Sequence, residues 1–529
     1  LYILFCKNTL KKALCLAQSR GKKTMKKAML HYHRLYQAGS IDYRLAGSFV
    51  EHINQCVYGG LYQPDHPTAD TLGFRGDLKE MIRRSGIRLI RYPGGNFVSG
   101  YHWTDGIGPK EKRPVRWNAA WNMPETNQVG LDEMVRYLRD VDVELMMAIN
   151  LGTGTPDEAA ALVEYCNFPS GTAWSELRRQ NGSPDPYDIH LWCVGNEMDG
   201  PWQIGHTDAA TYAEKFCQAA QLMRAVDPTI QLVACGSCSN ERAHTTFGQW
   251  DRIVLERAFD QMDYLSLHRY YGYDVEQNLL YPRLENMEDL AGMPADLEEM
   301  LLTIEGAIQL EKGKRHSAKK PKISFDELSV LPHNRISTNG TLVNAYRLVD
   351  AALYGALLCT LLCHAEFVKI NCQSLIVNEN GLFTAFPQGT VFPQSILYPF
   401  RDIARYANGV ALKPVGEVPQ TMTPHLGCAP SLYTACTWDE ASGKGTLFLA
   451  NLELENMTEL RFQLNGFSGL CFREHWSLSG TSPLEYNTEL EPERVHPKAD
   501  ELPLQQNENW QIILPPYSWH TLLFECPIQ

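Results

Sequence analysis

Eight short apolar or β-branched runs recur from about residue 46 onwards, and this rhythm constrains the fold more than any other feature of the chain. Polar loops and amphipathic stretches separate the runs, and Ala209–Val226 has the clearest helical periodicity among these stretches. Apolar runs with little alternation are typical of strands covered on both faces, as in a parallel sheet. The runs are Ser48–Ile53, Ile87–Tyr92, Glu144–Asn150, His190–Glu197, Gln231–Gly236, Tyr264–Tyr270, Lys322–Glu327 and Val368–Leu375.

Eight successive strand–helix units predict the α/β class and, within it, a (β/α)8 TIM barrel with long loops. The alternative is a doubly wound open sheet, which often carries a glycine-rich dinucleotide-binding turn after its first strand. No GxGxxG follows the first run, and Gly152-Thr153-Gly154 lacks the third glycine of that motif. We therefore favour the barrel.

The pattern changes after about residue 396, where strand-like runs follow one another without helical patterns between them. These runs are Ser431–Trp438, Gly445–Asn451, Glu459–Leu464 and Trp510–Leu514, and turn-rich stretches separate them. Such an arrangement is typical of an antiparallel β-sandwich. The predicted domains are N-terminal strands at 25–45 that join the sandwich, the catalytic barrel at 46–395 and the sandwich at 396–529.

The first two dozen residues differ from the rest of the chain. Leu1–Phe5 is apolar, but Lys7 and Lys11 interrupt it before an apolar run of signal-peptide length builds up. Met25 precedes the first segment of globular character, so we interpret residues 1–24 as a leader or a disordered extension. Because no later segment reaches transmembrane length without charges, we predict a cytoplasmic location.

The charge balance excludes two classes of partner. The 529 residues include 61 acidic and 48 basic side chains, a net charge of −13. Nucleic acids and anionic membranes both require a basic face, so we expect neither as a partner.

The fifteen cysteines are odd in number and scattered, which is typical of small buried side chains in a reducing compartment. Cys235 and Cys238 have CxxC spacing, but no second pair or histidine pair follows at zinc-finger distance. The histidines show no HExxH spacing either. We therefore expect no metal and no cofactor.

Two glutamates end predicted barrel strands: Glu197 closes the fourth run and Glu327 the seventh. Catalytic groups of barrel enzymes gather at these strand ends, and the fourth and seventh positions face each other across the mouth. A carboxyl pair of this kind is what a glycosidase needs, as proton donor and as nucleophile or base. Two alternatives stay open, because a glutamate at a strand end is more often a solvated loop residue, and because strand alternation aims only one of Asp326 and Glu327 inward.

The other strand ends carry polar and aromatic side chains that suit a sugar pocket. An arginine near a carboxylate keeps it ionised, and glycines in the turn Tyr92-Pro-Gly-Gly-Asn96 let the backbone approach a ligand. A histidine at such a place is, taken alone, more typical of a packed core. The polar residues are Glu51, Arg91, Asn96, His268 and Tyr270, and the loop tryptophans are Trp103, Trp117, Trp121 and Trp202.

Several motifs closely resemble those of glycoside hydrolase family 51, the intracellular α-L-arabinofuranosidases. The resemblance runs from about Met25 to the C-terminus. It is strongest in Gly47-Ser-Phe-Val-Glu-His52, Val57-Tyr-Gly-Gly-Leu-Tyr62, Arg91-Tyr-Pro-Gly-Gly-Asn-Phe-Val-Ser-Gly-Tyr101, Trp103-Thr-Asp-Gly-Ile-Gly-Pro109, Glu125-Thr-Asn-Gln-Val-Gly130, Gly195-Asn-Glu-Met-Asp-Gly-Pro-Trp-Gln-Ile-Gly-His206 and Ser324-Phe-Asp-Glu327.

The resemblance implies a (β/α)8 barrel with a jelly-roll-like sandwich, a retaining exo-acting arabinofuranosidase, an arabinose-containing oligosaccharide as substrate, and a homo-oligomer, frequently a hexamer. It implies that Glu197 is the general acid/base and that Glu327, rather than Asp326, is the nucleophile. The residues that would hold the sugar ring and the nucleophile are Glu51, Arg91, Asn96, Asn196 and Tyr270, with Trp121 as an aromatic wall and His268 as a further substrate-binding residue.

The chain departs from the family pattern in two places. Leu328 replaces the tryptophan that usually follows the nucleophile, and Leu375 stands where the family has a glutamine, with Gln373 two residues earlier. These changes affect one expected sugar contact, so two alternatives are kept. One is a retaining barrel glycosidase acting on a β-xyloside or β-glucan, and the other is a catalytically inactive sugar-binding protein.

Overall fold

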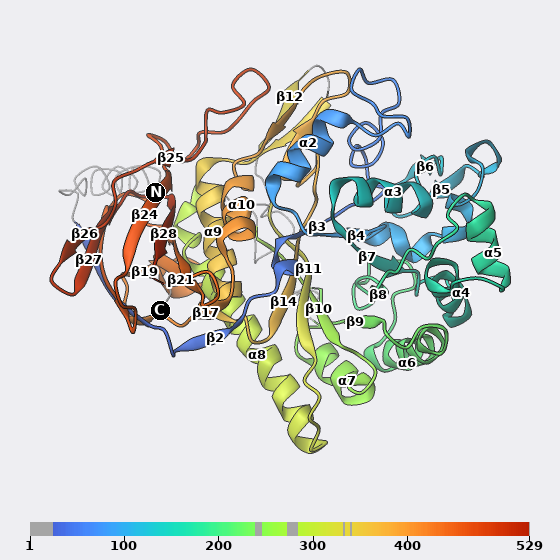
Figure 1. Cartoon of the computed structure of the whole chain (residues 1–529), viewed down its shortest axis with the longest axis horizontal. Coiled ribbons are helices and arrows are strands. Elements are labelled where there is room, and N and C mark those ends of the chain that lie inside the picture. The colour runs from blue at the N-terminus through green and yellow to red at the C-terminus, as the bar shows by residue number, and fades with distance from the viewer. Residues whose placement is uncertain (1–24, 239–245, 272–283, 332–333, 339–340, 528–529) are drawn as a thin grey trace, which may run out of the picture.

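The computed structural model describes residues 25–238, 246–271, 284–331, 334–338 and 341–527. A barrel and a β-sandwich lie side by side (Figure 1). The predicted leader, residues 1–24, lies outside the described residues. Within the part of the chain that the structure describes, no helix has both the length and the apolar character needed to cross a membrane.

The barrel is a closed parallel sheet with the strand order β10-β11-β14-β3-β4-β7-β8-β9. Each predicted run contributes one strand, so the predicted (β/α)8 fold is confirmed. The strands are β3 (Gly47–Phe49), β4 (Leu89–Tyr92), β7 (Glu144–Ile149), β8 (Leu191–Val194), β9 (Gln231–Cys235), β10 (Tyr264–Tyr271), β11 (Lys322–Val330) and β14 (Val368–Gln373).

Several observed strands end earlier than predicted. β3 stops at Phe49 and β8 at Val194, so Glu51 and Glu197 lie on the loops that leave the barrel. Gly195 takes a φ of +101° and Glu197 a φ of +43°, which extended strand geometry does not allow. The chain therefore turns over the barrel mouth at Gly195 and Glu197.

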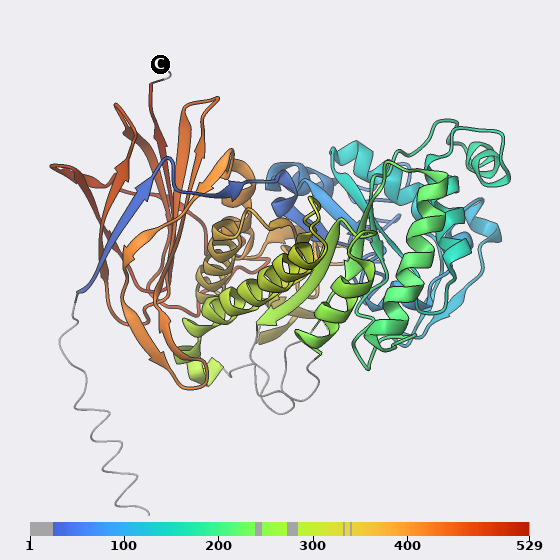
Figure 2. The same cartoon turned by 90° about the horizontal axis from the view of Figure 1, so that it is seen from below.

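Helices surround the barrel, and α6 (Ala209–Val226) has the predicted bounds because Asp208 caps its first turn and Asp227-Pro228 follows it. Helix α9 (Leu348–Cys363) is buried almost throughout and lies between barrel and sandwich, as Figure 2 shows from below. The other α-helices are α2 (Gly76–Ser85), α3 (Leu131–Val141), α4 (Pro156–Asn167), α5 (Ala173–Gln180), α7 (Gln249–Ala258), α8 (Gly292–Lys314) and α10 (Leu397–Tyr406).

The sandwich consists of two sheets packed around a core that includes Leu30, Trp438, Phe462 and Phe524. The first sheet has the order β18-β1-β23-β27-β26 and the second the order β2-β17-β21-β22-β28-β24-β25. All pairings are antiparallel except that of β1 with β23. The strands are β1 (Lys26–His33), β2 (Gln37–Ser40), β17 (Val410–Leu412), β18 (Val415–Glu417), β21 (Leu432–Asp439), β22 (Lys444–Asn451), β23 (Thr458–Asn465), β24 (Cys471–Leu478), β25 (Lys498–Ala499), β26 (Leu504–Gln506), β27 (Asn509–Leu514) and β28 (Ser518–Glu525).

Four short antiparallel hairpins lie in loops of the described chain, and in one of them β5 carries Trp117 and the turn between β5 and β6 carries Trp121. These hairpin strands are β5 (Arg116–Asn118), β6 (Met123–Glu125), β12 (Asn334–Thr338), β13 (Thr341–Ala345), β15 (Phe383–Ala385), β16 (Val391–Pro393), β19 (Gln420–Thr423) and β20 (Gly427–Pro430).

Candidate active site

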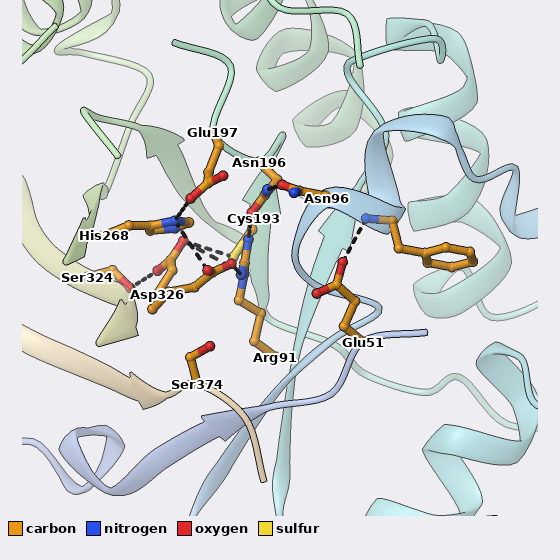
Figure 3. Close-up of polar contacts among 12 residues, drawn as sticks. Glu51, Arg91, Asn96, Cys193, Asn196, Glu197, His268, Ser324, Asp326 and Ser374 are labelled. Carbon is orange, nitrogen blue, oxygen red and sulfur yellow. Dashed lines mark hydrogen bonds and ion pairs between the residues drawn. The ribbon is translucent and has the colours of Figure 1, made fainter. Parts of the chain in front are cut away.

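The polar residues predicted at the strand ends converge on one point above the barrel. Figure 3 shows Glu197, His268 and Arg91 directed toward one another from the loop after β8, from β10 and from β4. Arg91 and His268 are almost fully buried, with 0% and 3% of their surface exposed. The sequence therefore predicted which side chains meet, although they are as much as 236 residues apart in the chain.

Glu327 is held by two donors inside this cluster. Arg91 donates from Nη1 to Oε1 over 2.8 Å, and the Tyr270 hydroxyl donates to Oε2 over 2.5 Å. Burial alone would raise the pKa of this carboxyl, but the positive charges of His268 and Arg91 and the two hydrogen bonds hold it below its ordinary value. Glu327 is therefore ionised and available to attack an electrophilic carbon.

Glu197 has the opposite electrostatic environment. Burial raises its pKa, and the negative charge of Glu327 raises it further against the hydrogen bond from His268. His268 Nδ1 lies 2.9 Å from Oε1, and Trp202 donates from Nε1 to Oε2 over 2.7 Å. A carboxyl with a raised pKa beside one with a lowered pKa is the acid and base assignment that glycosidases use.

His268 joins the two carboxyls. Its Nδ1 lies 2.9 Å from Glu197 Oε1 and 3.6 Å from Glu327 Oε2, and all three ligand-type atoms lie within 4.8 Å of one another. Burial lowers the pKa of His268, but the charge of Glu327 and the contact with Glu197 raise it overall. One oxygen of each carboxyl therefore lies within 4.8 Å of the other, whereas enzymes that place a water molecule between the two carboxyls separate them by about 6.5 Å or more.

Asp326 and Glu327 both point into the barrel, so the expectation that only one of them does is wrong. Asp326 accepts from Ser324 Oγ, contacts Cys193 Sγ at 3.5 Å and lies beside Arg91 (Figure 3). The reason is a bulge: Phe325 pairs with Leu267 and Glu327 with His268, so Asp326 is an extra residue in β11. A bulge turns the next side chain onto the same face.

Asn196 and Asn96 lie beside Arg91, as expected. Arg91 Nη2 donates to Asn196 Oδ1 over 2.5 Å, and Asn196 Nδ2 lies 3.4 Å from Asn96 Oδ1. Gln203, which the sequence analysis did not select, also contacts Asn196 at 3.3 Å. Its place in the long motif after Glu197 was the only available signal.

Glu51 stands on the other side of Arg91 and accepts from the Phe97 amide and from Trp121 Nε1, both over 2.8 Å. Burial and the charge of Glu327 raise its pKa to about 8, so Glu51 carries a proton at neutral pH. Gly95 makes this approach possible, because a Cβ there would lie 2.1 Å from a Glu51 oxygen.

Directly after the eighth barrel strand, β14, it is Ser374 that reaches the site, and neither Gln373 nor Leu375 does. Ser374 Oγ lies 2.7 Å from the Tyr270 hydroxyl, which already donates to Glu327, so Ser374 is the donor in this second bond. Gln373 turns away from the site and donates to Ser329 Oγ over 2.9 Å. Leu375 and Leu328 are buried core residues, so neither replaces its family counterpart as a polar or aromatic contact.

A (β/α)8 barrel whose mouth holds a half-buried and a buried carboxyl with opposite pKa shifts has the active-site arrangement of glycoside hydrolases. Two family models match the chain, the "Alpha-L-arabinofuranosidase 1 domain" over residues 81–280 and the "Alpha-L-arabinofuranosidase C-terminal domain" over residues 326–518. The chain belongs to the α-L-arabinofuranosidases of glycoside hydrolase family 51.

Individual relatives agree with this assignment. The chain is 39% identical to the intracellular exo-α-(1→5)-L-arabinofuranosidase 1 of Bacillus subtilis, over 85% of this chain and 90% of that protein. It is 37% identical to the corresponding enzyme of Halalkalibacterium halodurans, over 88% and 93%. A family 51 arabinofuranosidase structure from Bifidobacterium longum superposes with a TM-score of 0.87 at 34% identity, covering 95% of this chain and all of that one.

Proposed function

We propose that this glycoside hydrolase removes terminal α-L-arabinofuranosyl residues from arabinose-containing oligosaccharides, acting from the chain end with retention of configuration. The relatives named above are exo-acting arabinofuranosidases, which supports the sugar and the mode of action. The observation that carries the retaining mechanism is the short gap between the catalytic carboxyls. An oxygen of Glu197 and one of Glu327 lie within 4.8 Å, close to the ~5–5.5 Å of retaining enzymes.

The proposed reaction has two displacements. Glu327 attacks the anomeric carbon while protonated Glu197 donates its proton to the departing glycosidic oxygen, which leaves a glycosyl ester on Glu327. Glu197, now ionised, takes a proton from a water molecule that attacks the same carbon and releases arabinose. Arg91 and Tyr270 keep Glu327 ionised before the attack and stabilise the carboxylate again when it departs.

The remaining polar residues are proposed to bind the sugar. Protonated Glu51 can donate to a ring hydroxyl, Asn96 and Asn196 offer amide groups beside it, and Trp121 forms a wall. Trp202, which is 47% exposed and bonded to Glu197, stands where the leaving group would depart. Aromatic faces at exposed positions suit stacking on sugar rings.

The alternative substrates receive less support. Structures of a xyloglucanase and of a glucanase-xylanase are only 9% and 10% identical to the chain, so they show the barrel fold alone. A catalytically inactive binding protein would not need two neighbouring carboxyls with opposite pKa shifts. The intracellular names of the relatives support the predicted cytoplasmic location, and a homo-oligomer such as a hexamer stays a prediction from the family resemblance.

The experiment that tests the proposal is hydrolysis of p-nitrophenyl α-L-arabinofuranoside followed by proton NMR during the first minutes. We expect α-L-arabinose to form first and to mutarotate later, because two inversions at one carbon restore the starting configuration. The matched p-nitrophenyl β-D-xyloside should react at least about a hundredfold more slowly in kcat/KM, which corresponds to roughly 2.7 kcal/mol. Initial β-arabinose would contradict retention, and faster xyloside hydrolysis would contradict the sugar.

Tyr270→Phe tests how Glu327 is kept ionised. The variant removes one hydrogen bond to a charged carboxylate, so kcat/KM should fall by about 10–100-fold. That bond lowers the pKa of Glu327, and activity is lost as pH falls through this pKa, so the acid limb of the kcat/KM profile should move to higher pH. Ser374→Ala, which removes only a donor to Tyr270, is the control and should move the limb less. An unmoved acid limb in Tyr270→Phe would contradict the role of this bond.

A further inference from the structure

A cluster of two histidines and an aspartate lies in the β-sandwich, away from the catalytic residues. His475 is on β24, His520 on the neighbouring β28, and Asp500 directly follows β25, which pairs with β24 (Figure 1). His475 pairs with Leu522 and Ser477 with His520, so these four side chains share one face of the sheet. One ligand-type atom from each of the three residues lies within 4.8 Å of the other two.

The hydrogen bonds around the two rings determine where their protons are. His475 Nδ1 lies 2.5 Å from the Glu501 carbonyl oxygen, which can only accept, so Nδ1 carries the hydrogen. Ser518 donates its single hydroxyl hydrogen to the Pro515 carbonyl over 2.6 Å, so it can only accept from His520 Nε2 at 2.9 Å. His520 therefore carries its hydrogen on Nε2.

These assignments leave two bare nitrogens facing each other. His475 Nε2 and His520 Nδ1 are 3.0 Å apart, and each presents a lone pair to the other. A cation between the two nitrogens would relieve the repulsion of these lone pairs.

We propose that His475 Nε2, His520 Nδ1 and the Asp500 carboxylate form a binding site for a divalent cation of the zinc type. Two imidazoles and one carboxylate are ligands that Zn²⁺ accepts, with solvent in the fourth position. Tetrahedral Zn²⁺ holds two nitrogens about 3.4 Å apart, given Zn–N bonds of roughly 2.1 Å. The observed 3.0 Å needs to open by only a few tenths of an ångström.

The surroundings resemble those of a metal site in two respects. Ligand histidines usually donate their other ring N–H to a carbonyl, carboxylate or water, and here His475 donates to Glu501 and His520 to Ser518. Asp500 is exposed whereas the histidines are 4% and 0% exposed, so a cation can enter from the aspartate side.

A bound ion would join the segment between β24 and β25 to the sheet. This segment leaves the sandwich and contacts the barrel, where Glu485 O accepts from the Leu348 amide and Asn487 Nδ2 donates to Pro393 O. Asp500 lies just after its return to the sheet, so a cation bridging Asp500 to β24 and β28 would fix its C-terminal end. The ion would thus stabilise the contact between sandwich and barrel rather than take part in catalysis.

The test uses the full chain, freed of metal with a chelator and titrated with Zn²⁺ by calorimetry. We expect one equivalent to bind at this site and the melting temperature to rise by a few degrees at about 100-fold excess over Kd. Asp500→Asn should weaken this binding by about 10–100-fold, and His475→Asn should abolish it. Because the Asp500 side chain is exposed, its replacement should leave the fold and the arabinofuranosidase activity unchanged.

Glu197, His268 and Glu327 are a second group with suitable ligand atoms, so His268→Asn is the matched control. Zinc binding that persists in His268→Asn but weakens in Asp500→Asn supports the sandwich site. Co²⁺ should then give the intense visible absorption of a tetrahedral site in His268→Asn and lose it in His475→Asn. The proposal is overturned if no zinc binds, or if binding disappears in His268→Asn and survives in both sandwich variants. Either outcome is independent of the proposed enzymatic function.

Discussion

Replacing Glu327 with alanine is expected to lower kcat on p-nitrophenyl α-L-arabinofuranoside by on the order of 10⁴-fold or more. The variant lacks the carboxylate that would form the glycosyl ester, and the neighbouring Asp326 is engaged with Cys193 and Ser324 instead. A better leaving group should not restore the rate, because the missing group is the one that attacks carbon. Steady-state release of p-nitrophenol measures the loss.

Azide distinguishes a lost nucleophile from a damaged site. It is small enough for the space left by the Glu327 side chain, and it should restore part of the turnover by attacking the face that Glu327 attacks. A single displacement gives the β-arabinofuranosyl azide, whose configuration NMR identifies. Glu327→Gln and Asp326→Asn are the controls: the first should be as inactive as alanine, and the second should lose much less. More activity in Glu327→Ala than in Asp326→Asn would reverse the assignment.

The barrel was predictable because its signal is local and repeated. Each strand is an apolar run covered on both faces, and amphipathic stretches such as Ala209–Val226 separate the runs. Ala209–Val226 was predicted to the residue because Asp208 can cap the first turn and Asp227-Pro228 cannot continue the last. The resemblance to family 51 then assigned roles that periodicity could not.

The bulge in β11 was not predictable, because it arises from pairing with both neighbouring strands. Between Phe325 and Leu328 the chain advances three residues, whereas β14 advances two, from Asn371 to Gln373. Alternation along an isolated strand therefore gives the wrong orientation for one residue of the Asp326–Glu327 pair. The same limit applies to Ser374, which follows the last paired residue of β14.

The histidine pair of the sandwich escaped prediction for a related reason. His475 and His520 are 45 residues apart and belong to strands whose register no local pattern reveals. The residues of the candidate active site are also far apart in the chain. Barrel topology, however, places the C-terminal ends of all eight strands at one rim, so residues at these ends could be predicted to meet. A sandwich has no such rim.

Replacing Glu197 with alanine is the variant whose effect should depend most on the substrate. When the substrate is an arabino-oligosaccharide, the leaving group is an alcohol that needs a proton, so kcat/KM should fall by about 10³–10⁴-fold. From a dinitrophenyl arabinofuranoside the leaving group is dinitrophenolate, a stable anion that needs no proton. The kcat/KM on this substrate should therefore fall by less than about tenfold. Glu197 is also the base for hydrolysis of the glycosyl ester, so this second step becomes slower than the first in the variant. As a result, kcat on the aryl substrate should fall and an initial burst of the phenol should appear.

The pH profile and azide complete the test of Glu197. Its raised pKa belongs to the proton donor, so wild-type kcat/KM should fall as pH rises through that pKa, and this basic limb should vanish in Glu197→Ala. Azide should speed the second step and give the α-arabinofuranosyl azide, because Glu327 still performs the first inversion. Trp202→Phe, which removes a hydrogen bond to Glu197 but keeps an aromatic ring, should retain the basic limb. Equal losses on oligosaccharide and dinitrophenyl substrates in Glu197→Ala would contradict its role as the acid.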